Sequence, residues 1–194
     1  MLREIAKLIR FVSVPPIVVA AELTVLLLFE DVFPKTLDFW LALFFLGILP
    51  VLAYPLQRFI PAFRRGGQRM QRKLAFILSP IGYLGAVICS ILRGAIPNLL
   101  YISLVYLLSV ILLILINTLT SFHASGHGCS IGGSIILPCL FLGGYAILPG
   151  LLLFGLVFWA SVYLKRHTPG EFLLGALCAL ISAVCCYFLL HPAF

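Results

Sequence analysis

Seven long runs of apolar residues dominate this sequence and leave little chain for anything else. They cover roughly residues 12–29, 38–56, 74–92, 96–116, 128–144, 147–164 and 171–190. A helix needs about 20 mostly apolar residues to cross the hydrocarbon core of a bilayer. Solid runs of this kind also lack the alternation that a transmembrane β-strand requires. We therefore expect an all-α membrane helix bundle of about six to seven transmembrane helices, with residues 1–194 forming a single domain.

The composition excludes soluble and disordered classes of protein. Hydrophobic residues make up 63% of the chain and charged residues only 10%, whereas soluble domains carry about 25% charged residues. A disordered chain needs low hydrophobicity and high charge. The net charge of +7 comes from basic residues clustered in a few loops, which in a membrane protein indicate orientation and contact with lipid headgroups. We expect membrane lipids as partners and no nucleic acid.

The basic loops predict the orientation of the chain. With seven spans, three basic segments fall on one side of the membrane: the N-terminus, the connector 57–73 and the Lys165-Arg166 turn. Lys and Arg are enriched in cytoplasmic loops. This side is therefore expected to face the cytoplasm, and the chain to reside in a bacterial or archaeal cytoplasmic membrane.

Polar residues at membrane depth or at its rim concentrate in two segments, 121–127 and 165–171. Such residues are functional candidates. His127 and His167 are 40 residues apart, which accommodates two short spans joined by a Gly143-Gly144 hairpin. Because a hairpin returns the chain to the face that it left, both histidines can meet at the surface that also holds the basic connector. Two histidines, a carboxylate and a ring of guanidinium groups suit a phosphate carried by a lipid.

At these residues the sequence resembles a known family. The segment Ser125-Gly126-His127, preceded by Ser121-Phe122, is similar to the PSGH-type signature of the type-two phosphatidic acid phosphatase (lipid phosphate phosphatase) superfamily. The segment from Ser161 through His167 and Glu171 resembles its SR-x5-H-x3-D signature. The K-x6-RP signature is echoed upstream as Arg65-x6-Arg72-Lys73, and Arg58-x6-Arg65 fits equally well.

The resemblance implies a catalytic role for three residues. His167 would be the nucleophile that takes the phosphoryl group as a phosphohistidine. Glu171, one helical turn further on, would orient and polarise its imidazole. His127 would be the general acid that protonates the leaving lipid oxygen. No metal or cofactor is implied.

The same resemblance implies a set of phosphate ligands. Its members are Ser125, the amide of Gly126, Arg65, Arg72 and Lys73. A helix start and guanidinium groups would hold the phosphate oxygens and neutralise their charge. The activity expected is metal-independent hydrolysis of lipid phosphates or diphosphates. Phosphatidic acid, phosphatidylglycerol phosphate and polyprenyl diphosphates all qualify as substrates, with the tail staying in lipid, and the oligomeric state stays open.

The chain departs from the family pattern at three positions. Ala124 stands where the family has proline, and Glu171 where it usually has aspartate. The arginine six residues before the nucleophile is Ser161. On a continuing helix Lys165, four residues later, would lie on the same face and could supply the missing charge.

Other classes of protein compete with this interpretation. Ala124-Ser125-Gly126 matches half of the GxSG signature of rhomboid-type intramembrane proteases. His123-x3-His127 together with His167 has the ligand spacing of a zinc site. A non-catalytic relative that binds phospholipids is the third alternative, which Ser161 makes credible. The role of Glu22, in the middle of a span, is left open by the sequence.

Overall fold

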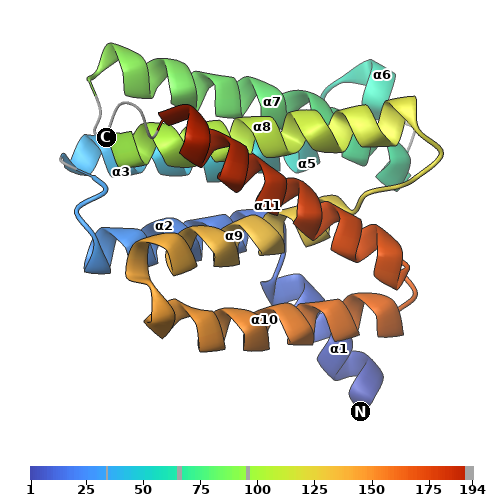
Figure 1. The fold of residues 1–194 in the computed structure, drawn as a ribbon. Coiled ribbons are helices and arrows are strands. Elements are labelled where there is room, and N and C mark those ends of the chain that lie inside the picture. The colour runs from blue at the N-terminus through green and yellow to red at the C-terminus, as the bar shows by residue number, and fades with distance from the viewer. Residues whose placement is uncertain (34, 65–66, 95–96, 191–194) are drawn as a thin grey trace.

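The computed structural model describes residues 1–33, 35–64, 67–94 and 97–190, and this part of the chain is helical and contains no strand. The first half comprises α1 (Leu2–Val12), α2 (Pro15–Phe29), α3 (Thr36–Ala42), the π-helical η1 (Leu43–Ile48), α4 (Leu49–Val51), α5 (Ala53–Leu56) and α6 (Pro61–Arg64). The second half comprises α7 (Gly67–Leu92), α8 (Pro97–Leu119), α9 (Gly126–Leu142), α10 (Gly144–Tyr163) and α11 (Pro169–Leu190). The predicted all-α bundle is confirmed (Figure 1).

Each of the seven apolar runs forms a helix or a series of helices, but fewer than seven have the length of a membrane span. Within the described residues five segments are long and apolar enough to cross a membrane: 36–56, 73–92, 97–119, 144–163 and 169–190. A sixth results if α1 and α2, which meet at a 60° bend, are counted as one span. The expected span at 128–144 becomes α9, which has only 17 residues. The five or six spans found in the described residues, together with the shorter apolar helix α9, agree with the expected bundle of about six to seven membrane helices.

The outer surface of the bundle exposes large apolar side chains, as expected for a surface in contact with lipid. On α10, Leu148, Leu151, Leu152 and Leu156 each expose more than half of their surface. Contiguous apolar patches of this kind are rare on soluble proteins and mark contact with a membrane or a partner.

Helix α9 lies at the centre of the fold and packs against α2, α8, α10 and α11. Its closest approach is to α11, where two glycines leave no room for a side chain. A Cβ atom on Gly128 would overlap the carbonyl oxygen of Phe172, and one on Gly175 would overlap the carbonyl oxygen of Ser125. The backbones of the two helices are therefore in direct contact at the start of α9 and in the first two turns of α11.

The hairpin that the sequence predicts between α9 and α10 is present. Gly143 joins the two helices with a φ of 64°, a left-handed conformation that glycine adopts without strain. The hairpin brings the end of α10 back beside the start of α9. As Figure 1 shows, the start of α9, the end of α10, the start of α11 and the short α6 lie at one end of the bundle.

Candidate active site

The two polar segments singled out in the sequence are joined directly by their backbones. The amide of Ser125 donates to the carbonyl oxygen of Glu171 at 2.9 Å. Asn117, on α8, holds the same segment from the other side: its Oδ1 accepts from the amide of Ala124 at 2.9 Å, and its Nδ2 donates to the Ala124 carbonyl at 3.1 Å. The loop before α9 is therefore fixed relative to the start of α11.

His167 and Glu171 form a pair at the start of α11. The Nδ1 atom of His167 lies 3.4 Å from Oε2 of Glu171. The same carboxylate oxygen accepts from the Thr168 amide at 3.1 Å, and the Glu171 amide donates to the Thr168 hydroxyl at 3.2 Å. This reciprocal arrangement is a capping box at the start of a helix. Glu171 thus caps α11 and contacts the imidazole with one oxygen, which orients the ring of His167.

His127 lies in the first turn of α9 and is buried. Its Nε2 is 3.2 Å from the hydroxyl oxygen of Ser13, a buried residue between α1 and α2. The break between these two N-terminal helices thus places a hydroxyl against the imidazole. Ser13 was not expected at the site, because an isolated serine carries no motif.

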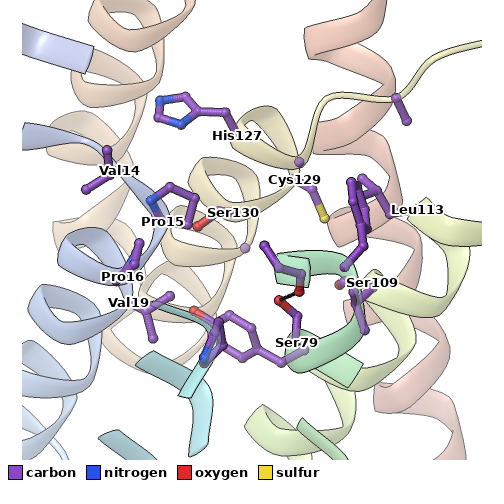
Figure 2. A pocket seen from close by; sticks show the side chains of 18 of the residues that line it. Val14, Pro15, Pro16, Val19, Ser79, Ser109, Leu113, His127, Cys129 and Ser130 are labelled. Carbon is purple, nitrogen blue, oxygen red and sulfur yellow. Dashed lines mark hydrogen bonds between the residues drawn. The ribbon is translucent and has the colours of Figure 1, made fainter. Parts of the chain in front are cut away.

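One cavity of about 1020 Å³ brings the expected catalytic residues together. His127, His167, Glu171 and Gly126 all line it, and His123 lies at its edge among the lining residues. Figure 2 shows the ring of His127 at one end of the pocket, with Val14, Pro15, Pro16 and Val19 along one side and Ser109 and Leu113 along another. The cavity therefore connects a histidine-rich end with an apolar interior.

Basic side chains from opposite ends of the chain line the same cavity. They are Lys7, Arg10 and Arg166. The Nη1 atom of Arg10 donates to the hydroxyl of Ser161 at 3.1 Å, across 151 residues of sequence. Ser161 is fully buried on α10, so the guanidinium of α1 reaches the position where the family pattern has an arginine. Arg10 belongs to the basic N-terminal segment, which was expected only to indicate the orientation of the chain.

The expectation that Lys165 supplies this charge needs correction. It assumed that the helix continues from Ser161 to Lys165, but α10 ends at Tyr163. Lys165 has a left-handed φ of 52°, which turns the chain after the helix. Lys165 is exposed and is not among the described residues that line the cavity. The cation beside Ser161 is Arg10.

The other expected phosphate ligands lie in different environments or outside the described residues. Ser125 is the N-cap of α9, where its Oγ accepts from the amide of Gly128 at 3.1 Å, and it is buried away from the cavity lining. Lys73 is exposed on α7 and is not among the described lining residues either. Arg65 lies outside the described residues, and of Arg72 only the backbone, in α7, is described.

The geometry also bears on the competing interpretations. The hydroxyl of Ser125 caps a helix, and the hydroxyl near His127 belongs to Ser13. Within the described part of the chain Ser125 is therefore not paired with a histidine, as a rhomboid-type protease requires. His123 is exposed, and its Nδ1 lies 3.3 Å from the carbonyl oxygen of Ser121. No cluster of three or more metal-binding side chains is found among the described residues.

Comparisons of the chain with protein-family models, with curated proteins and with solved structures find no match.

Proposed function

We propose that this chain is a membrane phosphatase that hydrolyses lipid phosphates or diphosphates through a phosphohistidine intermediate. One observation carries the proposal: the His167–Glu171 pair and His127 line a single cavity that also contains basic side chains. A nucleophile oriented by a carboxylate, with a second group that can carry a proton, is the arrangement that covalent catalysis requires.

In the first step the Nε2 atom of His167 attacks phosphorus. The contact between Nδ1 and Glu171 Oε2 stabilises the positive charge that develops on the ring. Burial and the neighbouring Arg10 and His167 disfavour the protonated form of His127, and the negative charge of the bound phosphate offsets this effect. The bond between phosphorus and the lipid oxygen breaks, and the protonated His127 donates its proton to that oxygen. The products of this step are a lipid alcohol and phosphorylated His167.

In the second step a water molecule attacks phosphorus. His127, now neutral, takes a proton from the water as the nitrogen–phosphorus bond breaks. Inorganic phosphate leaves, and both histidines return to their starting protonation states. Ser13, at 3.2 Å from Nε2 of His127, holds the ring in place through both steps as a positioning residue.

The charges of the cavity favour a phosphate over a neutral ligand. Among the described lining residues Lys7, Arg10 and Arg166 are basic and Glu171 is acidic. Charge-assisted hydrogen bonds from guanidinium groups to phosphate are stronger than those between neutral groups. In the transition state the same groups neutralise the charge on the equatorial oxygens.

The apolar exterior and the apolar part of the cavity support a lipid as the carrier of that phosphate. Phosphatidic acid, phosphatidylglycerol phosphate and polyprenyl diphosphates are the candidate substrates. The basic loops favour a site at the cytoplasmic face, and a bacterial or archaeal cytoplasmic membrane is the location that goes with this proposal.

A phosphate-release assay in detergent over these three lipids, with and without a metal chelator, tests the proposal. We expect release that the chelator leaves unchanged, and an acid-labile phosphoenzyme in rapidly quenched samples of the wild type. A chain that binds these lipids but releases no phosphate would instead be a non-catalytic lipid-binding protein.

A further inference from the structure

Helix α1 has two faces of opposite character. The outer face is apolar, and each of its five side chains exposes more than 40% of its surface: Leu2, Ile5, Leu8, Phe11 and Val12. The other face carries Lys7 and Arg10, which line the cavity. Apolar residues at spacings of three, four and seven form one stripe along a helix. An apolar stripe opposite a basic face is typical of a helix that lies in a membrane interface.

The direction of α1 also fits an interfacial position. The helix meets α2 at a 60° bend and packs against α10, and Figure 1 shows its N-terminus pointing away from the rest of the bundle. Its 11 residues make a helix of about 16 Å, which at this bend advances only about 8 Å along the axis of α2. The hydrocarbon core of a bilayer is about 30 Å thick, so α1 is far too short to cross it.

The inner side of α1 attaches the helix to the bundle through a small part of its surface. Ala6 is buried, and Ile9 packs on the apolar cluster that includes Phe172. One turn further on, Arg10 donates to the Ser161 hydroxyl at 3.1 Å. Most of the surface of α1 lies outside the bundle, so the contact between Arg10 and Ser161 depends on what holds the outer face.

The lipid bilayer is the neighbour that fits this outer face. The exposed leucines of α10 belong to a segment long and apolar enough to cross a membrane, and α1 packs against that segment, so the same lipid reaches both helices. Most charges of α1 are engaged elsewhere: Lys7 and Arg10 line the cavity, and the Glu4 carboxylate accepts from the Lys7 ammonium at 2.7 Å. Burial of apolar surface is therefore the main contribution to membrane binding by this face.

We propose that α1 lies in the membrane interface with its outer face inserted among the upper acyl chains, and that this insertion holds Arg10 at Ser161. The occupant of the face is the bilayer surface itself. The helix thereby makes one cation of the site dependent on contact with lipid. The position of α1 is independent of the proposed function, whereas its effect on catalysis rests on that function.

The first test places a single tryptophan on α1. The two tryptophans of the chain, Trp40 and Trp159, are replaced by phenylalanine, and Phe11→Trp is added. The full chain is reconstituted with lipids that carry bromine, which quenches tryptophan fluorescence on contact, either just below the headgroup or at the end of the acyl chain. We expect stronger quenching by the shallow bromines. Leu152→Trp, a similarly exposed position near the middle of α10, is the matched control and should be quenched more by the deep bromines.

Two results would overturn this position of α1. A tryptophan at position 11 that neither lipid quenches would mean that water or protein covers the face, as in a contact with a second copy of the chain or a soluble partner. Stronger quenching by the deep bromines would mean that α1 and α2 form one bent membrane span.

The second test asks whether insertion holds Arg10 in place. Leu8→Ser combined with Phe11→Ser removes two large apolar side chains from the outer face. In bilayers this double variant should lower kcat/KM for phenyl phosphate, a soluble substrate, by about 10-fold, since each side chain contributes at least that factor to insertion. Leu28→Ser combined with Phe29→Ser is the matched control, because it changes the same residue types at similar exposure at the distant end of α2. It should leave kcat/KM unchanged.

The loss must also depend on Arg10. In an Arg10→Ala background the serines at positions 8 and 11 should lower kcat/KM by less than about twofold, because the contact that they release is already absent, whereas independent effects would multiply. Wild-type activity in the double variant, or the same loss in both backgrounds, would overturn the coupling between insertion and the site. Thermal unfolding of each variant verifies the fold.

The two tests separate this inference from the proposed function. A wild type that releases no phosphate would contradict the phosphatase, and with it the effect of α1 on catalysis. The quenching by brominated lipids decides where α1 lies whether or not the chain turns over a substrate.

Discussion

The two sides of the site are built in different ways. The histidine side lies on the starts of α9 and α11, where Phe172 is fully buried and packs at 5.5 Å on the rings of Phe154 and Phe158. The basic side lies largely on α1, whose only buried residue is Ala6 and whose Leu8 and Phe11 are mostly exposed. The partly exposed His167–Glu171 pair is thus anchored to the core through Phe172, while the charge is delivered by a helix attached at the edge.

This difference shows how a cation on one helix can reach a buried position on another. A buried position on α10 carries the short Ser161, and Arg10 reaches it from a separate helix. Long-range electrostatic attraction tolerates such relocation, because a charge acts over several ångströms. A nucleophile and its orienting carboxylate cannot be relocated in this way, because the two groups must lie within hydrogen-bonding distance of each other.

The largest effect is expected on the core side. His167→Ala should reduce turnover to the background rate and remove the acid-labile phosphoenzyme, because no other group takes the phosphoryl group. Phosphate release and acid-quench labelling measure this, with circular dichroism to verify the fold. Unchanged activity in this variant would contradict the phosphohistidine mechanism.

His127→Ala should slow the reaction by about 10²–10⁴-fold, the usual contribution of a general acid or base. The loss should be smallest for an aryl phosphate, whose leaving oxygen needs no proton. Rates on an alkyl and an aryl phosphate in the same variant measure the difference. Equal losses on the two substrates would contradict the role of proton donor.

The basic side is tested by moving its charge. Arg10→Ala should lower kcat/KM by about 10–100-fold, the effect of one lost charge-assisted contact to phosphate. Arg10→Ala combined with Ser161→Arg should recover part of the loss, because the guanidinium returns to the same place from α10. Lys165→Ala is the matched control, because it removes an exposed cation, and it should have no measurable effect on kcat/KM. A large loss in this variant would instead show that Lys165, in the turn after α10, supplies the charge.

The packing of α9 on α11 is tested by one methyl group. Gly175→Ala should destabilise the fold by about 1–3 kcal/mol, the usual cost of overpacking, because its Cβ would overlap the Ser125 carbonyl oxygen. Gly155→Ala on α10, where a Cβ meets nothing within 4 Å, is the control and should not lower stability. Thermal unfolding in detergent measures both, and equal melting temperatures would show that the close contact is not required.

Much of the fold and part of the site could be predicted from local sequence. Apolar runs near membrane length predict helices, because the bilayer imposes one length scale on them. The turn at Gly143 predicts that α9 and α10 form a hairpin, and with it that His127 and His167 share one end of the bundle. Glu171, four residues after His167, predicts the contact that the structure contains. Each of these features depends on residues near one another in the chain.

The tertiary structure alone decided which distant residues meet. Arg10 and Ser161 are 151 positions apart, and Ser13 and His127 are 114 apart, so no spacing rule predicts either contact. Lys165 was expected beside Ser161 because a helix was assumed to continue, and the early end of α10 depends on how the turn packs. The cavity has the same origin, since residues from both halves of the chain line it, from Lys7 to Glu171. Local sequence determines where helices form and which faces they bury, whereas the packing of those faces against each other determines the site.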